Sequence, residues 1–305
     1  MPGKAKLSDF LSTRVSSDDE MLRLIRENTP PKLNGWLRIL PESWKDHWFT
    51  RPPEVRSLYY QKLIRWSSFL AYHRSGCTQG LPFGLYAKWG DVRRRRSEAL
   101  ATMYVAATTT IPVPIVLDLV PHPRGSLIIM TRLPGKDIMD ALDRGTVKPR
   151  EFEDKIRDWL GQLHALPTPD RRADGDAFGP YPDISSFQQG LYTSIAYEHH
   201  PRLQEIGKKS YAKRHRISFA HGDIHLNNIL VHHGKLSGLV DFECAGWYPE
   251  YWDFVVAYYM GQGVEKWKET LKKIFPQYSE ELELEKEMWP VHMEFARWKT
   301  IRRYF

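Results

Sequence analysis

Two polar clusters in the second half of the chain constrain its fold more than any other feature. The first, FAHGDIHLNNILV, runs from Phe219 to Val231, and the second, VDFE, ends at Glu243. The first cluster ends in the short apolar run ILV, and the turn-forming sequence HHGK joins it to a second apolar run, LSGLV, which leads into VDFE. This pattern predicts a short hairpin that brings the two clusters together.

The side chains of these clusters suit the transfer of a phosphoryl group. That reaction needs an aligned acceptor oxygen, neutralised phosphate oxygens and a group that takes the proton. Asp223, in a tight loop, can orient and deprotonate a hydroxyl group, and we predict that it is the catalytic residue. Asn228 and Asp241 offer a neutral and an anionic oxygen, which are hard ligands that Mg²⁺ prefers, so we predict that they bind the metal. The alternative for Asp223 is an aspartate that only caps its loop.

The two clusters resemble the catalytic loop and the metal-binding segment of the aminoglycoside phosphotransferase and choline kinase family. The residues that carry the resemblance are HGDIHLNNIL and VDFE, and it extends over most of residues 84–265. It implies an α+β, protein-kinase-like fold of two lobes, with a small antiparallel-sheet N-lobe and a mainly helical C-lobe. It also implies ATP as the phosphate donor, with GTP not excluded, and Mg²⁺ as the cofactor.

The same resemblance indicates nucleotide-binding residues in the first half of the chain. GLYAKWG places Lys88 on a strand, where the family uses a lysine to hold the α- and β-phosphates, and Glu98 would be its ion-pair partner. A lysine among apolar residues is costly to bury without a carboxylate, which favours the same pair, although both residues can also be surface charges. IIMTRLPG resembles the linker between lobes and places Met130 and Arg132 at the nucleotide, although Met130 fits a core position equally well.

A further aspartate, Asp253 in PEYWDFVVAYY, stands near the start of an apolar helix. In the family that this chain resembles, such an aspartate holds the backbone of the catalytic loop. Helix capping is the competing role.

Periodicity and turn residues predict the elements around these motifs. WSSFLAYHR and LPFGLYAKW, joined by SGCTQG, predict a hairpin. A helix over about 93–108 follows, with Asp91 as its N-cap, and IVLDL and SLIIMTR flank the turn PHPRG as two further strands. Apolar residues at helical spacing then predict a helix that ends before Pro167, followed by a loop over 168–186 and by helices from about residue 250 onward.

We expect three regions, which are an N-terminal extension packed on the kinase-like fold (1–60), a nucleotide-binding N-lobe (61–133), and a catalytic and acceptor-binding C-lobe (134–305). The four consecutive arginines from Arg93 to Arg96 favour a solvated helix start over a nucleic-acid site.

Composition narrows the remaining possibilities. The net charge of +7 suits a protein that handles phosphates, and no stretch approaches the roughly 18 apolar residues of a membrane span. Cys77 and Cys244 lie far apart and predict neither a disulfide framework nor a zinc site. We therefore expect a cytoplasmic protein that binds neither nucleic acid nor a membrane, with its oligomeric state left open.

The leading functional prediction is an ATP- and Mg²⁺-dependent O-phosphotransferase that acts on a small hydroxyl-containing molecule. Glu243 stands where protein kinases have a glycine, and no APE-type segment follows Asp241, which disfavours a protein kinase. A catalytically weak pseudoenzyme that binds nucleotide or a protein partner is the alternative. It stays open because SGCTQG lacks the GxGxxG pattern and the extension has no counterpart in the family.

Overall fold

The computed structural model describes residues 18–30, 43–70, 72, 74–138, 149–167, 201–202, 204–205, 209, 213–261 and 264–287. The chain divides into two compact units. The first comprises residues 1–147 and 227–245, and the second comprises residues 148–226 and 246–305. These units differ from the lobes proposed from the sequence, because the hairpin predicted between the two polar clusters groups with the first half of the chain.

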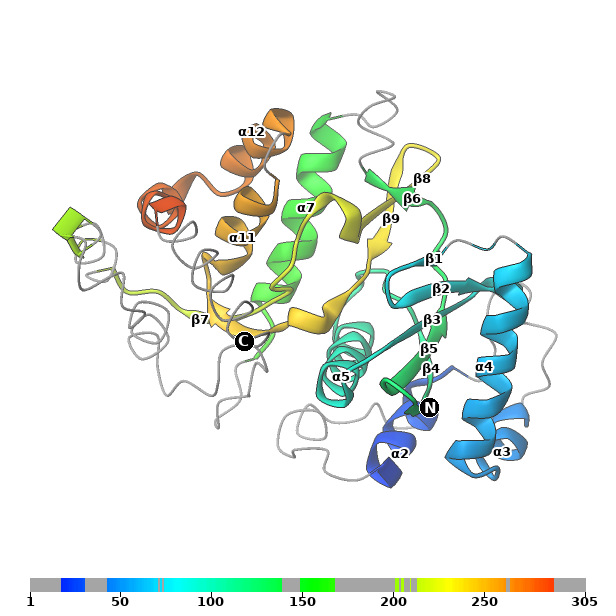
Figure 1. Cartoon of the computed structure of the whole chain (residues 1–305). Helices are drawn as coiled ribbons and strands as arrows, with labels where there is room; N and C mark the ends of the chain where they lie inside the picture. The colour runs from blue at the N-terminus through cyan, green and yellow to red at the C-terminus, as the bar shows by residue number, and fades with distance from the viewer. Residues whose placement is uncertain are drawn as a thin grey trace, which may run out of the picture. The chain divides into compact units, whose positions relative to one another are not determined.

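The first unit is built on a five-stranded antiparallel sheet in the order β1-β2-β3-β5-β4 (Figure 1). Its strands are β1 (Arg74–Ser75), β2 (Thr78–Leu81), β3 (Leu85–Gly90), β4 (Val116–His122) and β5 (Gly125–Thr131). In β3 and β5, Lys88 lies opposite Ile128, and Tyr86 lies opposite Met130. Because opposed residues share a face and every second residue returns to it, Lys88 and Met130 lie on the same face of the sheet.

Helix α5 (Val92–Thr108) connects β3 to β4 and packs on the sheet (Figure 1). The Asp91 side chain accepts hydrogen bonds from the backbone N–H groups of Arg93 and Arg94, at 3.0 and 3.2 Å, which confirms the predicted N-cap. The predicted helix is therefore present, and β4 and β5 are the two strands predicted on either side of the turn PHPRG.

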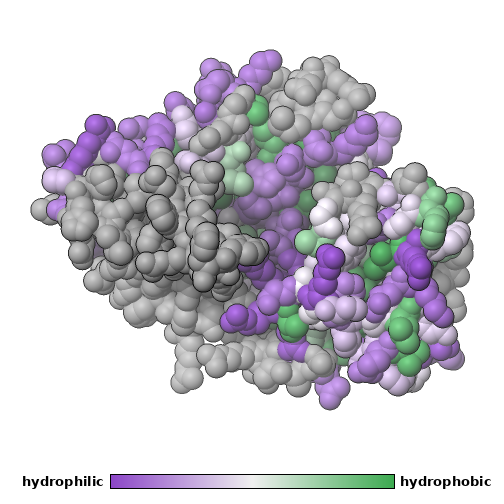
Figure 2. All heavy atoms as spheres, in the orientation of Figure 1, coloured by the Kyte–Doolittle hydropathy of each residue, from purple (hydrophilic) through white to green (hydrophobic). Residues whose placement is uncertain are grey.

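Helix α4 (Pro53–Phe69) shows that the first strand of the predicted hairpin is wrong, because WSSF forms the last turn of this helix. Pro53 occupies the first helical position, where its missing N–H has no consequence. One side of α4 packs on the sheet, while Trp66 and Phe69 are 52% and 80% exposed. The aromatic residues of this run therefore resemble the pattern of a strand although they belong to a helix. Hydrophobic side chains are visible at the surface over α4 (Figure 2). The turn within SGCTQG instead joins β1 to β2, and α4 crosses the proposed boundary at residue 60.

The described parts of the N-terminal extension pack on this unit. They form α2 (Asp18–Asn28), α3 (Trp44–Phe49) and the first half of α4 up to residue 60. Thr29 Oγ1 donates to the carbonyl of Val116 at 3.2 Å, and the Trp48 indole donates to Asp118 at 3.0 Å, so both helices are fastened to the edge strand β4.

A second, three-stranded sheet completes the first unit. Its order is β6-β8-β9, with β6 (Lys136–Asp137), β8 (Ile229–His232) and β9 (Lys235–Leu239), and β8 with β9 is the predicted hairpin. At Gly238 an added Cβ would lie 2.4 Å from the carbonyl oxygen of Pro112, so only glycine allows this close approach. The backbone N–H of Leu239 donates to the same carbonyl at 3.0 Å.

The second unit is mainly helical. Strands β7 (Ile217–Ala220) and β10 (Gly246–Pro249) pair in antiparallel fashion, and the helices are α7 (Pro149–His164), α11 (Trp252–Met260) and α12 (Glu265–Ile274), with residues 279–287 also helical. Short 3-10 turns across both units are η2 (Pro82–Gly84), η3 (Leu226–Asn228), η4 (Phe242–Cys244) and η5 (Pro276–Tyr278). Helix α7 ends before Pro167, as predicted, whereas the loop predicted over 168–186 lies outside the described residues. Among the described helices, none combines the length and the hydropathy that crossing a bilayer requires.

Candidate functional site

Lys88 is a buried cation. Carboxylates from two distant segments of the first unit surround it. It lies on β3 and is 7% exposed. Its Nζ lies 3.1 Å from Glu98 Oε1, 2.6 Å from Asp241 Oδ1 and 3.0 Å from Glu243 Oε2. Burial lowers the pKa of Lys88, but Glu98 and Asp241 outweigh it and leave that pKa raised, so the side chain stays an ammonium.

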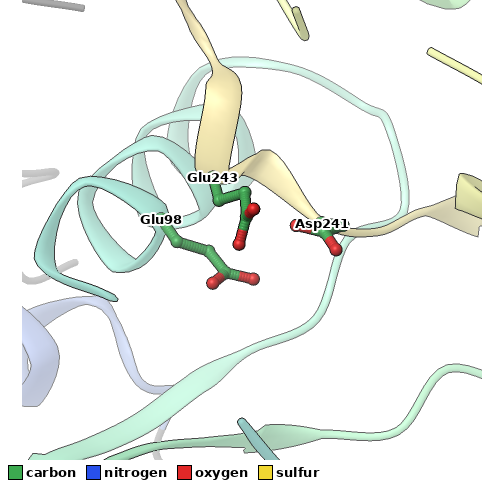
Figure 3. Close-up of side chains that lie close together, drawn as sticks. All are labelled: Glu98, Asp241 and Glu243. Carbon is green, nitrogen blue, oxygen red and sulfur yellow. The ribbon is translucent and has the colours of Figure 1, made fainter. Parts of the chain in front are cut away.

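The three carboxylates converge on one point (Figure 3), Glu98 from α5 and the other two from the segment that follows β9. One oxygen of each lies within 4.8 Å of the others. Burial raises the pKa of Glu98 to about 7, an effect that Lys88 opposes and Asp241 reinforces. The backbone of Asp241 has φ 68°, a left-handed conformation that is uncommon outside glycine and that clusters at functional sites.

Arg95 is a member of this cluster that sequence reasoning missed. Its Nη1 donates to Glu98 Oε2 and its Nη2 donates to Glu243 Oε2. It is 4% exposed, so the predicted solvated helix start is wrong at this position, although it holds for the exposed Arg93 and Arg94. The only sequence signal that could have marked Arg95 is its position three residues before Glu98 on one helix.

The predicted metal ligands Asn228 and Asp241 stand at the two ends of the β8–β9 hairpin. Asn228 is 6% exposed, and its backbone carbonyl accepts a hydrogen bond from the N–H of Val240 at 3.0 Å. Since Val240 directly precedes Asp241, the hairpin brings the two predicted ligands into neighbouring positions, as the sequence indicated.

Of the two residues predicted from the linker, one lies on the same sheet face as Lys88. Met130 is 7% exposed, and its opposite neighbour Tyr86 stands two residues before Lys88 on β3. The Arg132 side chain is exposed, and its backbone N–H donates to the carbonyl of Gly84 at 2.7 Å. Of the two residues, Met130 is thus the buried one that shares a sheet face with Lys88.

In the second unit, a buried aspartate holds the loop that carries Asp223. Asp253 is 0% exposed and accepts hydrogen bonds from the backbone N–H groups of His221 and Gly222, at 3.1 and 2.9 Å. The N-cap of α11 is Tyr251 rather than Asp253, so Asp253 holds the loop and does not cap the helix. The His221 ring in turn accepts the N–H of Asp223 at 3.3 Å.

The side chain of Asp223 remains accessible although the backbone of its loop is fixed. It is 24% exposed, and its Oδ2 lies 3.5 Å from His225 Nε2. A carboxylate that meets a dissolved substrate needs both features, because a fixed backbone limits the positions that an accessible side chain adopts.

The family comparison agrees with this geometry. The model of the phosphotransferase enzyme family (APH) matches residues 88–287, which is more than half of the 305 residues. The chain therefore belongs to the phosphotransferase enzyme family, as the sequence motifs predicted. No curated protein sequence matches the chain significantly.

Solved structures share the fold at low sequence identity. A thermostable mutant of aminoglycoside phosphotransferase APH(4)-Ia, in a ternary complex with AMP-PNP and hygromycin B, is 13% identical with a TM-score of 0.55, over 76% of this chain and 94% of that one. APH(4)-Ia itself is 13% identical with a TM-score of 0.54, over 79% and 94% of the two chains. The GDP complex of wild-type aminoglycoside 2'-phosphotransferase-IIIa is 10% identical with a TM-score of 0.51, over 75% and 86%. These similarities confirm the predicted kinase-like α+β fold.

Proposed function

We propose that this protein transfers the γ-phosphoryl group of ATP to a hydroxyl group of a small molecule in a Mg²⁺-dependent reaction. The observation that supports the proposal most strongly is the buried Lys88 ammonium, which Glu98 and Asp241 both bind. Membership of the phosphotransferase enzyme family supports it. Similar folds were solved with AMP-PNP and with GDP, which supports a nucleotide as the donor.

In the first unit, Lys88 binds the α- and β-phosphates, and Glu98 holds its ammonium in place for that contact. The donor set there fits a hard divalent cation, because three carboxylates face the two cations Lys88 and Arg95 and leave a surplus of negative charge. Asn228 and Asp241 would hold Mg²⁺, which when bound neutralises phosphate oxygens. Met130 would line the base pocket.

Asp223 accepts the proton of the acceptor. The hydroxyl oxygen forms a bond to the γ-phosphorus, the bond from that phosphorus to the β,γ-bridging oxygen breaks, ADP leaves, and the hydroxyl proton passes to the Asp223 carboxylate. The hydrogen bonds that the backbone N–H groups of His221 and Gly222 donate to Asp253 keep the loop of this carboxylate in position. The class of acceptor that we would test first is the aminoglycosides, since a neighbouring structure contains hygromycin B.

The proposal is tested by following the γ-phosphate of ATP onto a library of small hydroxyl compounds that includes hygromycin B and kanamycin. We expect transfer that EDTA abolishes, with kcat reduced about 10²- to 10⁴-fold in Asp223→Asn because the proton acceptor is removed. Asp154→Asn is the matched control, because Asp154 is an exposed aspartate on α7.

Three results would distinguish the alternatives. Transfer that persists at full rate in Asp223→Asn would contradict the assigned base. Tight ATP binding by the wild-type protein without transfer to any compound would favour the pseudoenzyme. The absence of both binding and transfer would contradict the proposal as a whole.

A further inference from the structure

The four arginines at the start of α5 have very different environments. Arg93 and Arg94 are exposed and Arg96 is half-buried, whereas Arg95 is 4% exposed. A guanidinium is costly to bury without partners, so the burial of Arg95 depends on the groups that bind it. Those partners are Glu98 and Glu243, which also contact Lys88.

The arrangement divides the oxygens of these glutamates between the two cations. Glu98 gives Oε1 to Lys88 and Oε2 to Arg95, while Glu243 shares Oε2 between them. The planar fork of an arginine can bind two carboxylates at once with fixed geometry, which a lysine cannot do. Arg95 therefore fixes the orientation in which both glutamates face Lys88.

The charge of Arg95 affects how Lys88 can bind a phosphate. Three carboxylates around a single ammonium would hold that ammonium strongly and would leave it less able to turn to a phosphate. Arg95 balances part of that negative charge from the side of α5, so that the two cations share the three carboxylates. It contacts the glutamates and acts through them.

We propose that Arg95 is a positioning residue that neutralises Glu98 and Glu243 so that Lys88 is available to the nucleotide phosphates. This inference rests on the proposed function. It assigns a role to Arg95 and to its partner Glu243. Removal of Arg95 should weaken binding of MgATP more than it slows the chemical step, because Lys88 then has to neutralise both glutamates alone.

The test is steady-state kinetics of phosphate transfer with MgATP, together with direct MgATP binding and urea unfolding for each variant. We expect Arg95→Met to raise the KM for MgATP about tenfold while kcat changes less than about threefold. Arg94→Met is the matched control, one position earlier and exposed, and it should leave both parameters unchanged. Arg95→Lys keeps the charge without the fork and should raise the KM about threefold.

Rescue separates positioning from a purely structural role. If Arg95 acts by neutralising Glu243, the double variant Arg95→Met with Glu243→Gln should return the KM to within about threefold of Glu243→Gln alone. An Arg95→Met variant that is less stable but has an unchanged KM would overturn the inference, as would a double variant with no rescue. Should Arg95→Met fail to fold, Arg95→Lys and the double variant decide by the same criteria.

The two proposals fail in different ways. A wild-type protein that neither binds MgATP nor transfers phosphate would overturn the proposed function, and this inference with it, before any variant is compared. An active wild-type protein whose Arg95→Met variant has the same kinetics as Arg94→Met would overturn this inference alone.

Discussion

Two clusters of buried charge lie in the same unit and have different designs. Asp118 is 0% exposed and accepts hydrogen bonds from several of the described residues. Arg56 contributes Nε at 3.0 Å and Nη2 at 3.2 Å, the Trp48 indole donates at 3.0 Å, and the Tyr60 hydroxyl donates at 3.1 Å. One anion and one cation balance, and these three side-chain donors come from α3 and α4, while the backbone N–H of Leu119 on β4 also donates, at 2.9 Å.

The cluster around Lys88 is neither balanced nor closed. Its three carboxylates exceed its two cations, and the side chains of Asp241 and Glu243 are 32% and 24% exposed. Asp241 also adopts a left-handed backbone conformation. Burial of charge alone therefore does not mark a functional site in this protein. The surplus of one sign, the access to solvent and the unusual backbone distinguish the cluster that we propose binds a nucleotide from the one that fastens helices to β4.

The largest expected difference between the clusters concerns Asp241. Asp241→Asn should lower kcat/KM about 10³-fold, because it removes the negative charge that we propose binds Mg²⁺ where charge develops in the reaction. The free energy of unfolding should stay within about 0.5 kcal/mol of wild type, since the change also relieves the surplus of negative charge. Transfer assays and urea unfolding on the same preparation check both halves. A marked loss of stability together with full activity would reverse the roles of the two clusters.

The opposite pattern is expected for Arg56. Arg56→Met leaves Asp118 as a buried charge without its cation, so the free energy of unfolding should fall by about 3–5 kcal/mol. The KM for MgATP should not change. Arg65→Met, on the exposed side of the same helix, is the control and should have little effect on stability. Equal stabilities of the two variants in urea would show that the N-terminal helices are not anchored through Asp118.

The smallest effect on stability is expected for an ion pair that is exposed to solvent. Glu27 pairs with Arg23 one turn away on α2, and both side chains are more than 40% exposed. Glu27→Gln should change the free energy of unfolding by less than about 0.5 kcal/mol, because solvent screens an exposed pair. A larger loss in chemical denaturation would mean that exposure is a poor guide to the value of ion pairs in this chain.

Sequence reasoning succeeded where local chemistry decides the structure. Asp91 caps its helix because its side chain reaches the first free N–H groups, and HHGK makes a turn whatever surrounds it. It also predicted the ion pair between Lys88 and Glu98, since a motif with fixed spacing carries three-dimensional information, but it did not predict the contact between Lys88 and Asp241.

The failures occurred where tertiary packing decides. The aromatic run at Trp66 and Phe69 was predicted to form a strand, but the helix that begins at Pro53 continues through it. Arg95 stands three residues before Glu98, but its second partner, Glu243, is 148 residues further along the chain, so the contact that completes its site is a long-range one. The return of residues 227–245 to the first unit is likewise a long-range property.

Titration calorimetry of ATP with Mg²⁺ shows without any assay of turnover whether the Lys88 cluster binds a magnesium nucleotide, as we propose. The proteins to compare are the wild type, Lys88→Met and Lys62→Met, the last being an exposed lysine on α4. We expect the wild type and Lys62→Met to bind MgATP equally, and Lys88→Met to lose most of this affinity. Unchanged affinity in Lys88→Met would contradict the proposal.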